Sequence, residues 1–324
     1  MAKDKIPSAN KIEEHDIIMI GAGPSALAAA VYTTREDIDT VLLEKGVVGG
    51  LAAITDQVDN YPGFPKGITG LDLAERLEEQ AERFGADIRY GEVTSIIAHP
   101  EDDTVHVETN EDKTFKAKAV LIATGSDYRK INVPGEKEYY GRGVHYCATC
   151  DGAFYRDKKI VVVGGGNSAV QESLFLTRFT SHIDLLVRST VKASEVLQHE
   201  LKKAVDAGKI TIHLNVTPEE IIGEDNKVIK VMAKKDGKEI EIDTNGVFVF
   251  VGLLPNTQFL KNSDIKLDDT GFVLVDRNLQ TSMTGVFCSG DVRSGATMQI
   301  ASAVGEGATA ALKIREYLED PTRK

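Results

Sequence analysis

Two stretches far apart in the chain share one pattern, and this repeat constrains the fold more than any other feature. Residues 15–30 read HDIIMIGAGPSALAAA, and residues 159–173 read KIVVVGGGNSAVQES. Each has an apolar run, then G-x-G-x-x-A, then small residues compatible with a helix, which predicts a buried parallel strand, a tight glycine turn and a helix start. One such turn also occurs for packing alone, but two copies in the same context favour two nucleotide-binding βαβ units.

The small residues of each copy have a physical role in holding a pyrophosphate. The second glycine lets the backbone approach the ligand, and the small third position lets helix and strand pack closely. The free N–H groups at the helix N-terminus then attract the anion. The first set is Gly21, Gly23 and Ala26, and the second is Gly164, Gly166 and Ala169.

The two copies differ where such a unit selects its nucleotide. In the first, the strand after the helix ends at Glu44, and a carboxylate there hydrogen-bonds the ribose of an adenosine without a 2′-phosphate. The same offset in the second copy falls on Val187, with Arg188 and Lys192 close behind. Cations there can take a 2′-phosphate, which predicts NADP rather than NAD, although they also serve simply to solvate a strand end.

Length and charge narrow the class of protein. At 324 residues the chain is long enough for about two domains. A formal net charge of -12 argues against a nucleic-acid partner, which is gripped through clustered Lys and Arg. The first fifteen residues lack the apolar segment of a secretory signal, and no apolar run reaches the roughly 18 residues of a membrane span. We therefore expect a cytoplasmic protein with no membrane partner.

Cys147 and Cys150 stand close together in HYCATCDG, and the chain has only one other cysteine. A zinc site needs four ligands, and Cys288 is alone in an apolar strand, so we expect no metal. In a compartment that keeps thiols reduced, such a pair is typical of a redox-active dithiol. Asp151 follows directly; a carboxyl group can give a proton to a departing thiolate, and it can also cap a short helix.

The chain also carries further recognisable stretches. CATCDG at 147–152 stands ahead of the second glycine motif, and the others are GAGPSA (21–26), GG (49–50), NYPGFP (60–65), ATG (123–125), GGGNSAV (164–170), PNT (255–257) and GDVR (290–293). Together they resemble the low-molecular-weight, FAD-containing thioredoxin reductases over nearly the whole length.

The resemblance implies an α/β fold class with two Rossmann-like, three-layer ββα nucleotide-binding domains, the second inserted in the first. It places the FAD-binding domain in residues 1–128 and 257–324. It places an inserted NAD(P)-binding-like domain, which carries the dithiol, in residues 129–256. Members of the family are usually homodimers, so the resemblance also implies a homodimer.

The resemblance assigns roles to single residues. For FAD these are Gly21, Gly23, Pro24, Ser25 and Glu44 along the ADP half, Gly49, Gly50 and Asn60 toward the flavin, Thr124 and Gly125 closing the site, and Gly290, Asp291, Gln299 and Ile300 near the ribityl chain and ring. For the nicotinamide nucleotide they are Gly164, Gly166, Asn167, Ser168, Arg188 and Lys192. The catalytic residues are Cys147 and Cys150, with Asp151 as the proton donor.

The implied activity is that of a thioredoxin-disulfide reductase-like flavoprotein oxidoreductase. Cys150 would face the flavin, and Cys147 would attack the disulfide of thioredoxin or a thioredoxin-like protein. The segment VRSTVKAS departs from the family pattern, because Val187 and Ser189 stand where a His and an Arg are usual. The resemblance makes NADPH the first expectation for the electron donor. The departure at these positions makes reduced ferredoxin the alternative donor. A flavin redox sensor without turnover is a hypothesis of another class.

Overall fold

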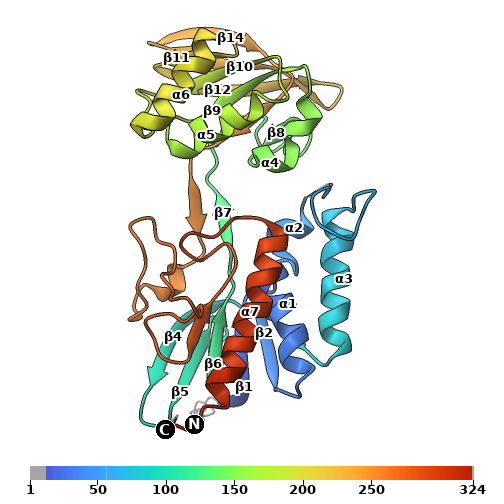
Figure 1. The fold of residues 1–324 in the computed structure, drawn as a ribbon, viewed down its shortest axis with the longest axis vertical. Coiled ribbons are helices and arrows are strands. Elements are labelled where there is room, and N and C mark those ends of the chain that lie inside the picture. The colour runs from blue at the N-terminus through green and yellow to red at the C-terminus, as the bar shows by residue number, and fades with distance from the viewer. Residues whose placement is uncertain (1–11, 56, 323–324) are drawn as a thin grey trace, which may run out of the picture. The chain divides into compact units, whose positions relative to one another are not determined.

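The computed structural model describes residues 12–55 and 57–322, and the chain divides into two compact units (Figure 1). Unit 1 comprises Met1–Asp127 and Pro255–Lys324, and unit 2 comprises Tyr128–Leu254. The two connecting segments, β7 (Ser126–Tyr128) and β16 (Leu253–Pro255), pair with each other. Among the described residues, no helix is long and apolar enough to cross a membrane.

Unit 1 is built on a seven-stranded sheet in the order β3-β2-β1-β6-β5-β4, with β17 also paired to β6. The parallel strands are β1 (Glu13–Ile20), β2 (Thr40–Glu44), β3 (Asp87–Tyr90), β6 (Thr114–Ile122) and β17 (Val286–Cys288). The antiparallel strands are β4 (Val93–His99) and β5 (Thr104–Thr109). β5 pairs with the first part of β6 and β17 pairs with its last part, so both strands lie along the same edge of β6.

Alternation along β1 explains the two layers that cover this sheet. Ile17 and Met19 belong to the apolar cluster shared with the helices, whereas Ile18 and Ile20 belong to the cluster shared with β4 and β5. The helices are α1 (Pro24–Thr34), α2 (Gly50–Ala53), α3 (Gly70–Arg83) and α7 (Ile300–Leu318), with a short 3-10 turn η2 (Gln258–Leu260). In Figure 1, α7 runs alongside α1 on the helical face.

Unit 2 repeats this arrangement on a five-stranded parallel sheet in the order β11-β10-β9-β15-β8. Its strands are β8 (Val144–His145), β9 (Lys159–Val163), β10 (His182–Val187), β11 (Ile210–Leu214) and β15 (Val247–Val249). The antiparallel strands β12 (Val216–Glu224), β13 (Lys227–Lys235) and β14 (Lys238–Asp243) cover one face. The other face carries α5 (Asn167–Leu176) and α6 (Glu195–Asp206), and α4 (Ala148–Asp151) and η1 (Gly152–Tyr155) follow β8.

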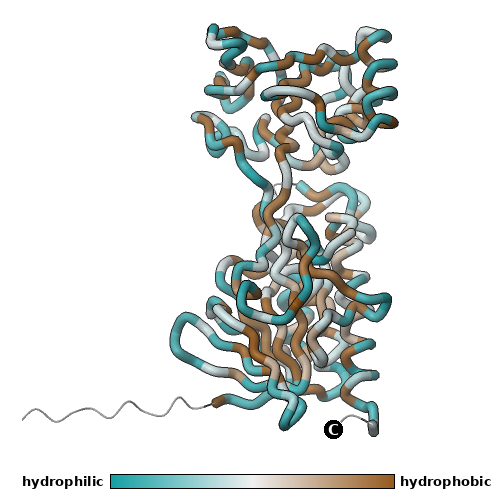
Figure 2. The backbone as a smooth tube through the Cα atoms, turned by 90° about the vertical axis from the view of Figure 1, so that its left-hand side faces the viewer, coloured by the Kyte–Doolittle hydropathy of each residue, from teal (hydrophilic) through white to brown (hydrophobic). Residues whose placement is uncertain are grey.

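The two units therefore place equivalent elements in equivalent positions. β1, α1 and β2 of unit 1 correspond to β9, α5 and β10 of unit 2, and both glycine motifs form the turn between a strand and its helix. Figure 2 shows brown, hydrophobic stretches along the strands of the sheets, as the sequence pattern predicts. The predicted α/β fold with two three-layer units is confirmed.

Candidate functional site

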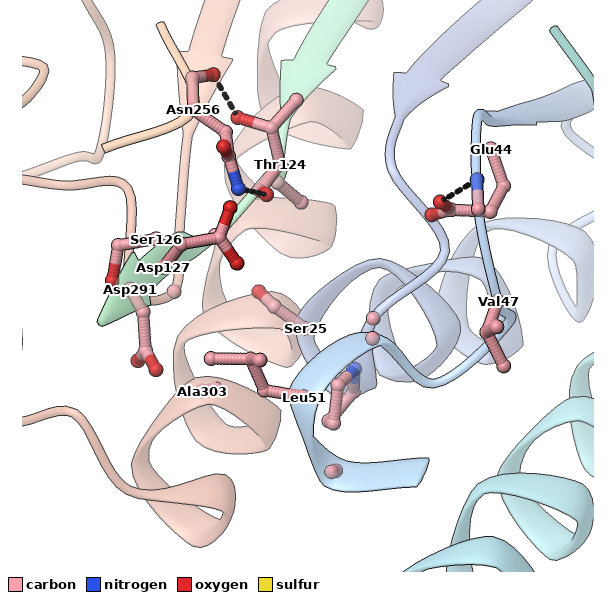
Figure 3. A pocket seen from close by; sticks show the side chains of 18 of the residues that line it. Ser25, Glu44, Val47, Leu51, Thr124, Ser126, Asp127, Asn256, Asp291 and Ala303 are labelled. Atoms are coloured by element: carbon pink, nitrogen blue, oxygen red, sulfur yellow. Dashed lines mark hydrogen bonds between the residues drawn. The ribbon is translucent and has the colours of Figure 1, made fainter. Parts of the chain in front are cut away.

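A pocket opens in unit 1 beside the first glycine turn (Figure 3). Because the carboxyl ends of parallel strands meet at one edge of the sheet, it collects the ends of β2 and β6 and the start of α1. Most of the residues predicted for FAD line it, and these are Gly23, Pro24, Ser25, Glu44, Gly50, Thr124, Gly125, Gly290, Asp291 and Ile300.

The two glycines of this turn have different surroundings. Gly21 has φ +98°, and a Cβ built there would lie 2.6 Å from the carbonyl oxygen of Ala123. A Cβ built on Gly23 would meet nothing within 4 Å, although Gly23 lines the pocket. Gly21 therefore permits a close approach between backbones, whereas Gly23 leaves open space of the kind a pyrophosphate needs.

Glu44 is held rigidly at one side of the pocket. One of its carboxylate oxygens accepts the N–H of Ala22 at 2.7 Å, and the other accepts the N–H of Gly46, also at 2.7 Å. Each carboxylate oxygen has a second lone pair that can accept a ribose hydroxyl. The predicted ribose contact therefore has a fixed carboxylate in the pocket wall.

Asp291 lies across the pocket from Glu44, together with Asp127 (Figure 3). Burial, and to a lesser extent the charge of Glu306, raises the pKa of Asp291 to about 6. A carboxyl group with this pKa is present in both protonation states near neutral pH, so it can donate or accept a hydrogen bond. This suits a polar ligand chain better than a bare phosphate, which would repel the carboxylate.

Sequence reasoning did not assign a role to Asn256, which closes one wall of the pocket. Its amide nitrogen donates to the Thr124 carbonyl at 3.0 Å, and the Thr124 hydroxyl donates to the Asn256 carbonyl at 2.8 Å. The PNT motif was noted as a stretch, and an amide directly after a short strand is the signal that could have identified it. The other lining residues without a predicted role include Leu51, Ser126 and Asp127.

Four of the predicted FAD residues do not line this pocket. Gly21 contributes to a neighbouring smaller pocket. A Cβ on Gly49, which has φ +92°, would lie 2.4 Å from the Cβ of Ala74, so this glycine faces α3. Asn60 donates from its side-chain amide to the Gln299 side-chain oxygen at 3.0 Å. The structure thus joins Asn60 and Gln299 to each other.

The second glycine turn, in unit 2, reproduces the geometry of the first. Gly164 has φ +145°, and a Cβ there would lie 2.3 Å from the Phe250 carbonyl oxygen. A Cβ on Gly166 would meet nothing within 4 Å. Gly166 precedes α5, whose first residues are Asn167 and Ser168, both exposed.

The segment after β10 lies against this second turn. The N–H of Lys192 donates to the Gly165 carbonyl at 2.6 Å, and the Asn167 side-chain oxygen accepts the N–H of Ser194 at 2.8 Å. The side chains of Arg188 and Lys192 are exposed, and neither forms an ion pair with any described residue. Both cations therefore stay available to a ligand at the turn.

Cys147 and Cys150 form a disulfide, with their Cα atoms 5.3 Å apart. Cys147 is the N-cap of α4, and its sulfur accepts the N–H of Cys150 at 3.1 Å. Asp151 ends α4, and its carboxylate lies 3.2 Å from Nδ1 of His145. The predicted catalytic residues thus come together on one short helix, because they are adjacent in sequence.

The aromatic residues next to the dithiol in sequence divide between core and surface. Tyr146 and Tyr155 are buried, whereas Phe154 is exposed. Cys288 is fully buried, and burial raises the pKa of its thiol far above the usual range, as expected of an inert core residue. Within residues 12–55 and 57–322, no three His, Cys, Asp or Glu side chains are arranged to hold a metal ion.

Comparison with known proteins gives consistent matches over almost the whole chain. Residues 15–307 match the family described as pyridine nucleotide-disulphide oxidoreductase. The chain is 40% identical to a thioredoxin reductase of Listeria monocytogenes over 96% of each chain, and 41% identical to one of Bacillus subtilis over 94% of this chain and 95% of that one. The crystal structure of a thioredoxin reductase from Streptococcus pyogenes superposes with a TM-score of 0.89 at 38% identity, covering 95% of this chain and 99% of that one.

Proposed function

Because the chain belongs to the thioredoxin reductases of the pyridine nucleotide-disulphide oxidoreductase family, we propose that it is an FAD-dependent disulfide reductase that acts on thioredoxin or a thioredoxin-like protein. The observation that carries the proposal is the pair of Cys147 and Cys150 on a short helix with Asp151 beside them. A dithiol of this kind exchanges with a protein disulfide through a mixed disulfide.

The pocket of unit 1 fits FAD on three features of its lining. The bare backbone at Gly23 leaves room for the pyrophosphate, Glu44 presents a fixed carboxylate to the ribose, and Asp291 offers a hydrogen-bond partner with a raised pKa. When bound, FAD supplies a carrier that accepts two electrons from a nicotinamide and gives them to a disulfide. The chain itself binds and orients the dinucleotide through the turn at β1 and α1.

The dithiol half of the activity has a direct test. We expect Cys147→Ser and Cys150→Ser to abolish reduction of thioredoxin disulfide, because either change removes one of the two sulfurs. NADPH should still bleach the visible flavin band in both variants. Cys288→Ala is the matched control and should keep full activity, since that thiol is buried and outside the site. Full thioredoxin reduction by Cys147→Ser would refute the assignment.

NADPH is the donor that unit 2 supports. Val187 is buried at the end of β10, so no carboxylate stands where a 2′-phosphate would be repelled, and Arg188 and Lys192 are exposed beside the turn. We expect Arg188→Ala with Lys192→Ala to raise the KM for NADPH by at least about 100-fold, because each of the two lost charge-assisted contacts costs about 1.5–3 kcal/mol. The KM for NADH should stay unchanged.

A control for this experiment removes the same charge elsewhere in unit 2. Lys235 and Lys238 are exposed on the β13–β14 hairpin, and alanine at both should leave the KM for NADPH unchanged. Anaerobic titration of the wild-type flavin with NADPH, NADH and reduced ferredoxin identifies the donor. Bleaching by ferredoxin alone would replace NADPH with the alternative donor. Absence of dithiol turnover with every donor would favour the redox sensor instead.

Two further properties follow from family membership and remain predictions. We expect a homodimer, which sedimentation of the FAD-loaded protein at several concentrations would reveal. We also expect the protein to work in the cytoplasm, where NADPH and reduced thioredoxin are used, and fractionation of cells would test this expectation.

A further inference from the structure

A buried chain of three polar side chains lies directly beside the dithiol. The imidazole of His145, at the end of β8, has Nδ1 3.2 Å from the Asp151 carboxylate and Nε2 2.7 Å from the Tyr155 hydroxyl. The side chains of His145 and Asp151 are 7% and 19% exposed, and Tyr155 is 6% exposed. His145 is therefore largely shielded from water and has a polar partner on each ring nitrogen.

Packing fixes the orientation of this imidazole. Its ring meets Tyr155 edge-on at 5.3 Å between centroids and lies 5.2 Å from Phe248. His145 also pairs with Phe248 across the strands β8 and β15. The ring cannot turn away from Asp151 without breaking these contacts, so the core of unit 2 holds Nδ1 beside the Asp151 carboxylate.

Asp151 can gain or lose one proton while His145 keeps a polar partner on each ring nitrogen, because the neutral imidazole changes tautomer. Burial, followed by the charge of Asp151, raises the pKa of Tyr155 above its usual range, so its hydroxyl keeps its proton and can donate or accept. When Asp151 is a carboxylate, Nδ1–H faces its oxygen at 3.2 Å and Tyr155 donates to Nε2. When Asp151 is a carboxylic acid, it donates to Nδ1, and Nε2–H donates to Tyr155.

We propose that His145 is a positioning residue that orients Asp151 and balances its two protonation states during thiol–disulfide exchange. This inference rests on the proposed function. In the exchange, the disulfide bond of the partner breaks, the Cys147–Cys150 bond forms, and the electron pair passes to the two partner sulfurs. The two thiol protons of the enzyme end on the partner, and the proton of Cys150 travels through the Asp151 carboxylate.

Of the charged groups in the described part of the chain, Asp151 is the one that contacts His145 in an ion pair, and Lys158 lies over the ring of Tyr155 at 5.5 Å. β15 faces the imidazole with apolar Phe248, and η1 contributes the Tyr155 hydroxyl. Asp151 is also the charged group that shifts the pKa of Tyr155. On α5, which packs against α4, burial raises the pKa of Glu172, so this neighbour carries less negative charge than an exposed glutamate.

The test compares single variants with a double variant. His145→Asn keeps a hydrogen-bond donor near the position of Nδ1 but cannot titrate, and Asp151→Asn removes the proton carrier. Pre-reduced enzyme is mixed with thioredoxin disulfide, and dithiol oxidation is followed by stopped flow over the range in which histidine titrates, about pH 5–8. We expect Asp151→Asn to slow the exchange by about 100-fold or more, in the range of general acid–base catalysis.

His145→Asn should lower the limiting exchange rate by roughly 10-fold, less than the loss of the acid–base group itself, leave the half-saturating concentration of thioredoxin unchanged and flatten the pH profile. The double variant should be no slower than Asp151→Asn alone, because His145 acts through Asp151. Tyr155→Phe, which keeps the ring, should move the profile in the same direction. A wild-type profile for His145→Asn, or losses that multiply in the double variant, would overturn the proposal.

Failure of the proposed function would look different. A wild-type dithiol that reacts with a small aromatic disulfide but not with thioredoxin would refute the partner. The same variants measured on the small disulfide would then decide the role of His145 separately, since that reaction needs the same proton transfer at Cys150. Equal rates for wild type and His145→Asn on the small disulfide would count against the proposal.

Discussion

Replacing Gly23 by alanine should separate ligand binding from protein stability. Gly23 precedes α1 with φ -75°, a conformation that any residue can adopt, and a Cβ there would meet nothing within 4 Å. The added methyl group would project into the pocket of unit 1. It should therefore cost nothing in the FAD-free protein and should overlap the pyrophosphate when FAD binds.

The magnitudes follow from these surroundings. Alanine is a poorer N-cap than glycine by about 0.5–1 kcal/mol, but it restricts the unfolded chain by about 0.4–1 kcal/mol, so the free energy of unfolding should change little. Overpacking in a filled site costs about 1–3 kcal/mol. We therefore expect Gly23→Ala to weaken FAD affinity by about 10- to 100-fold.

Two further glycines provide controls for this variant. Gly21 has φ +98°, and a Cβ there would lie 2.6 Å from a carbonyl oxygen. Gly21→Ala should therefore destabilise the FAD-free protein by at least about 1–2 kcal/mol. Gly305 is exposed within α7 and has open space around it, so Gly305→Ala should stabilise by about 0.5–1 kcal/mol and leave FAD affinity unchanged.

The assay is FAD titration of the FAD-free protein, followed by flavin fluorescence, with urea unfolding of the same preparation. Wild-type FAD affinity in Gly23→Ala would refute the placement of the pyrophosphate at this turn. Loss of stability without loss of affinity would show that Gly23 is needed for packing instead.

Three other changes test the architecture around the pocket. Burial raises the pKa of Asp291 to about 6, so the native state binds this proton more tightly than the unfolded chain does, and the free energy of unfolding falls as pH rises toward 6. Asp291→Asn should therefore be more stable than wild type above about pH 6, and the difference should disappear near about pH 4. Thermal unfolding of the FAD-free protein measures this difference. A Cβ on Gly307 would lie 2.0 Å from the Ser25 carbonyl oxygen, so Gly307→Ala should force α7 from α1 and lower the free energy of unfolding by about 1–3 kcal/mol in urea titration. Glu306→Gln should cost about 1–3 kcal/mol in the same titration, since it leaves the half-buried guanidinium of Arg293 without its carboxylate.

The two βαβ units could be predicted from the residues because their signals are local, whereas the insertion of one domain in the other came from the resemblance to the thioredoxin reductases. Strand, glycine turn and helix start occupy consecutive residues in both copies, and successive side chains of each strand point to opposite faces of the sheet. The dithiol site could also be predicted from the sequence, because Cys147, Cys150 and Asp151 lie within five consecutive residues. These features need no knowledge of long-range contacts.

The parts that sequence reasoning missed depend on distant segments. The amide after a short strand marks Asn256 as a candidate, but Asn256 reaches the pocket because its segment pairs with that of Thr124, which lies 132 residues away in sequence. His145 reads as an isolated histidine, since no other histidine is near it in sequence. The role proposed for His145 depends on the structure, in which η1 places the Tyr155 hydroxyl against the imidazole at the end of β8.

The two glycine turns also bear on the choice of donor. In both copies the first glycine, Gly21 or Gly164, packs against a backbone carbonyl, whereas the second, Gly23 or Gly166, faces open space. A site that had lost its ligand would be under no physical requirement to keep that second position bare. Val187 stands at the position that Glu44 occupies in the first copy, and it leaves this geometry untouched, so the absence of a carboxylate there bears on which nucleotide is preferred and not on whether one fits. This supports NADPH over a donor that bypasses unit 2, and it predicts that Gly166→Ala weakens NADPH binding while leaving FAD binding and the free energy of unfolding unchanged.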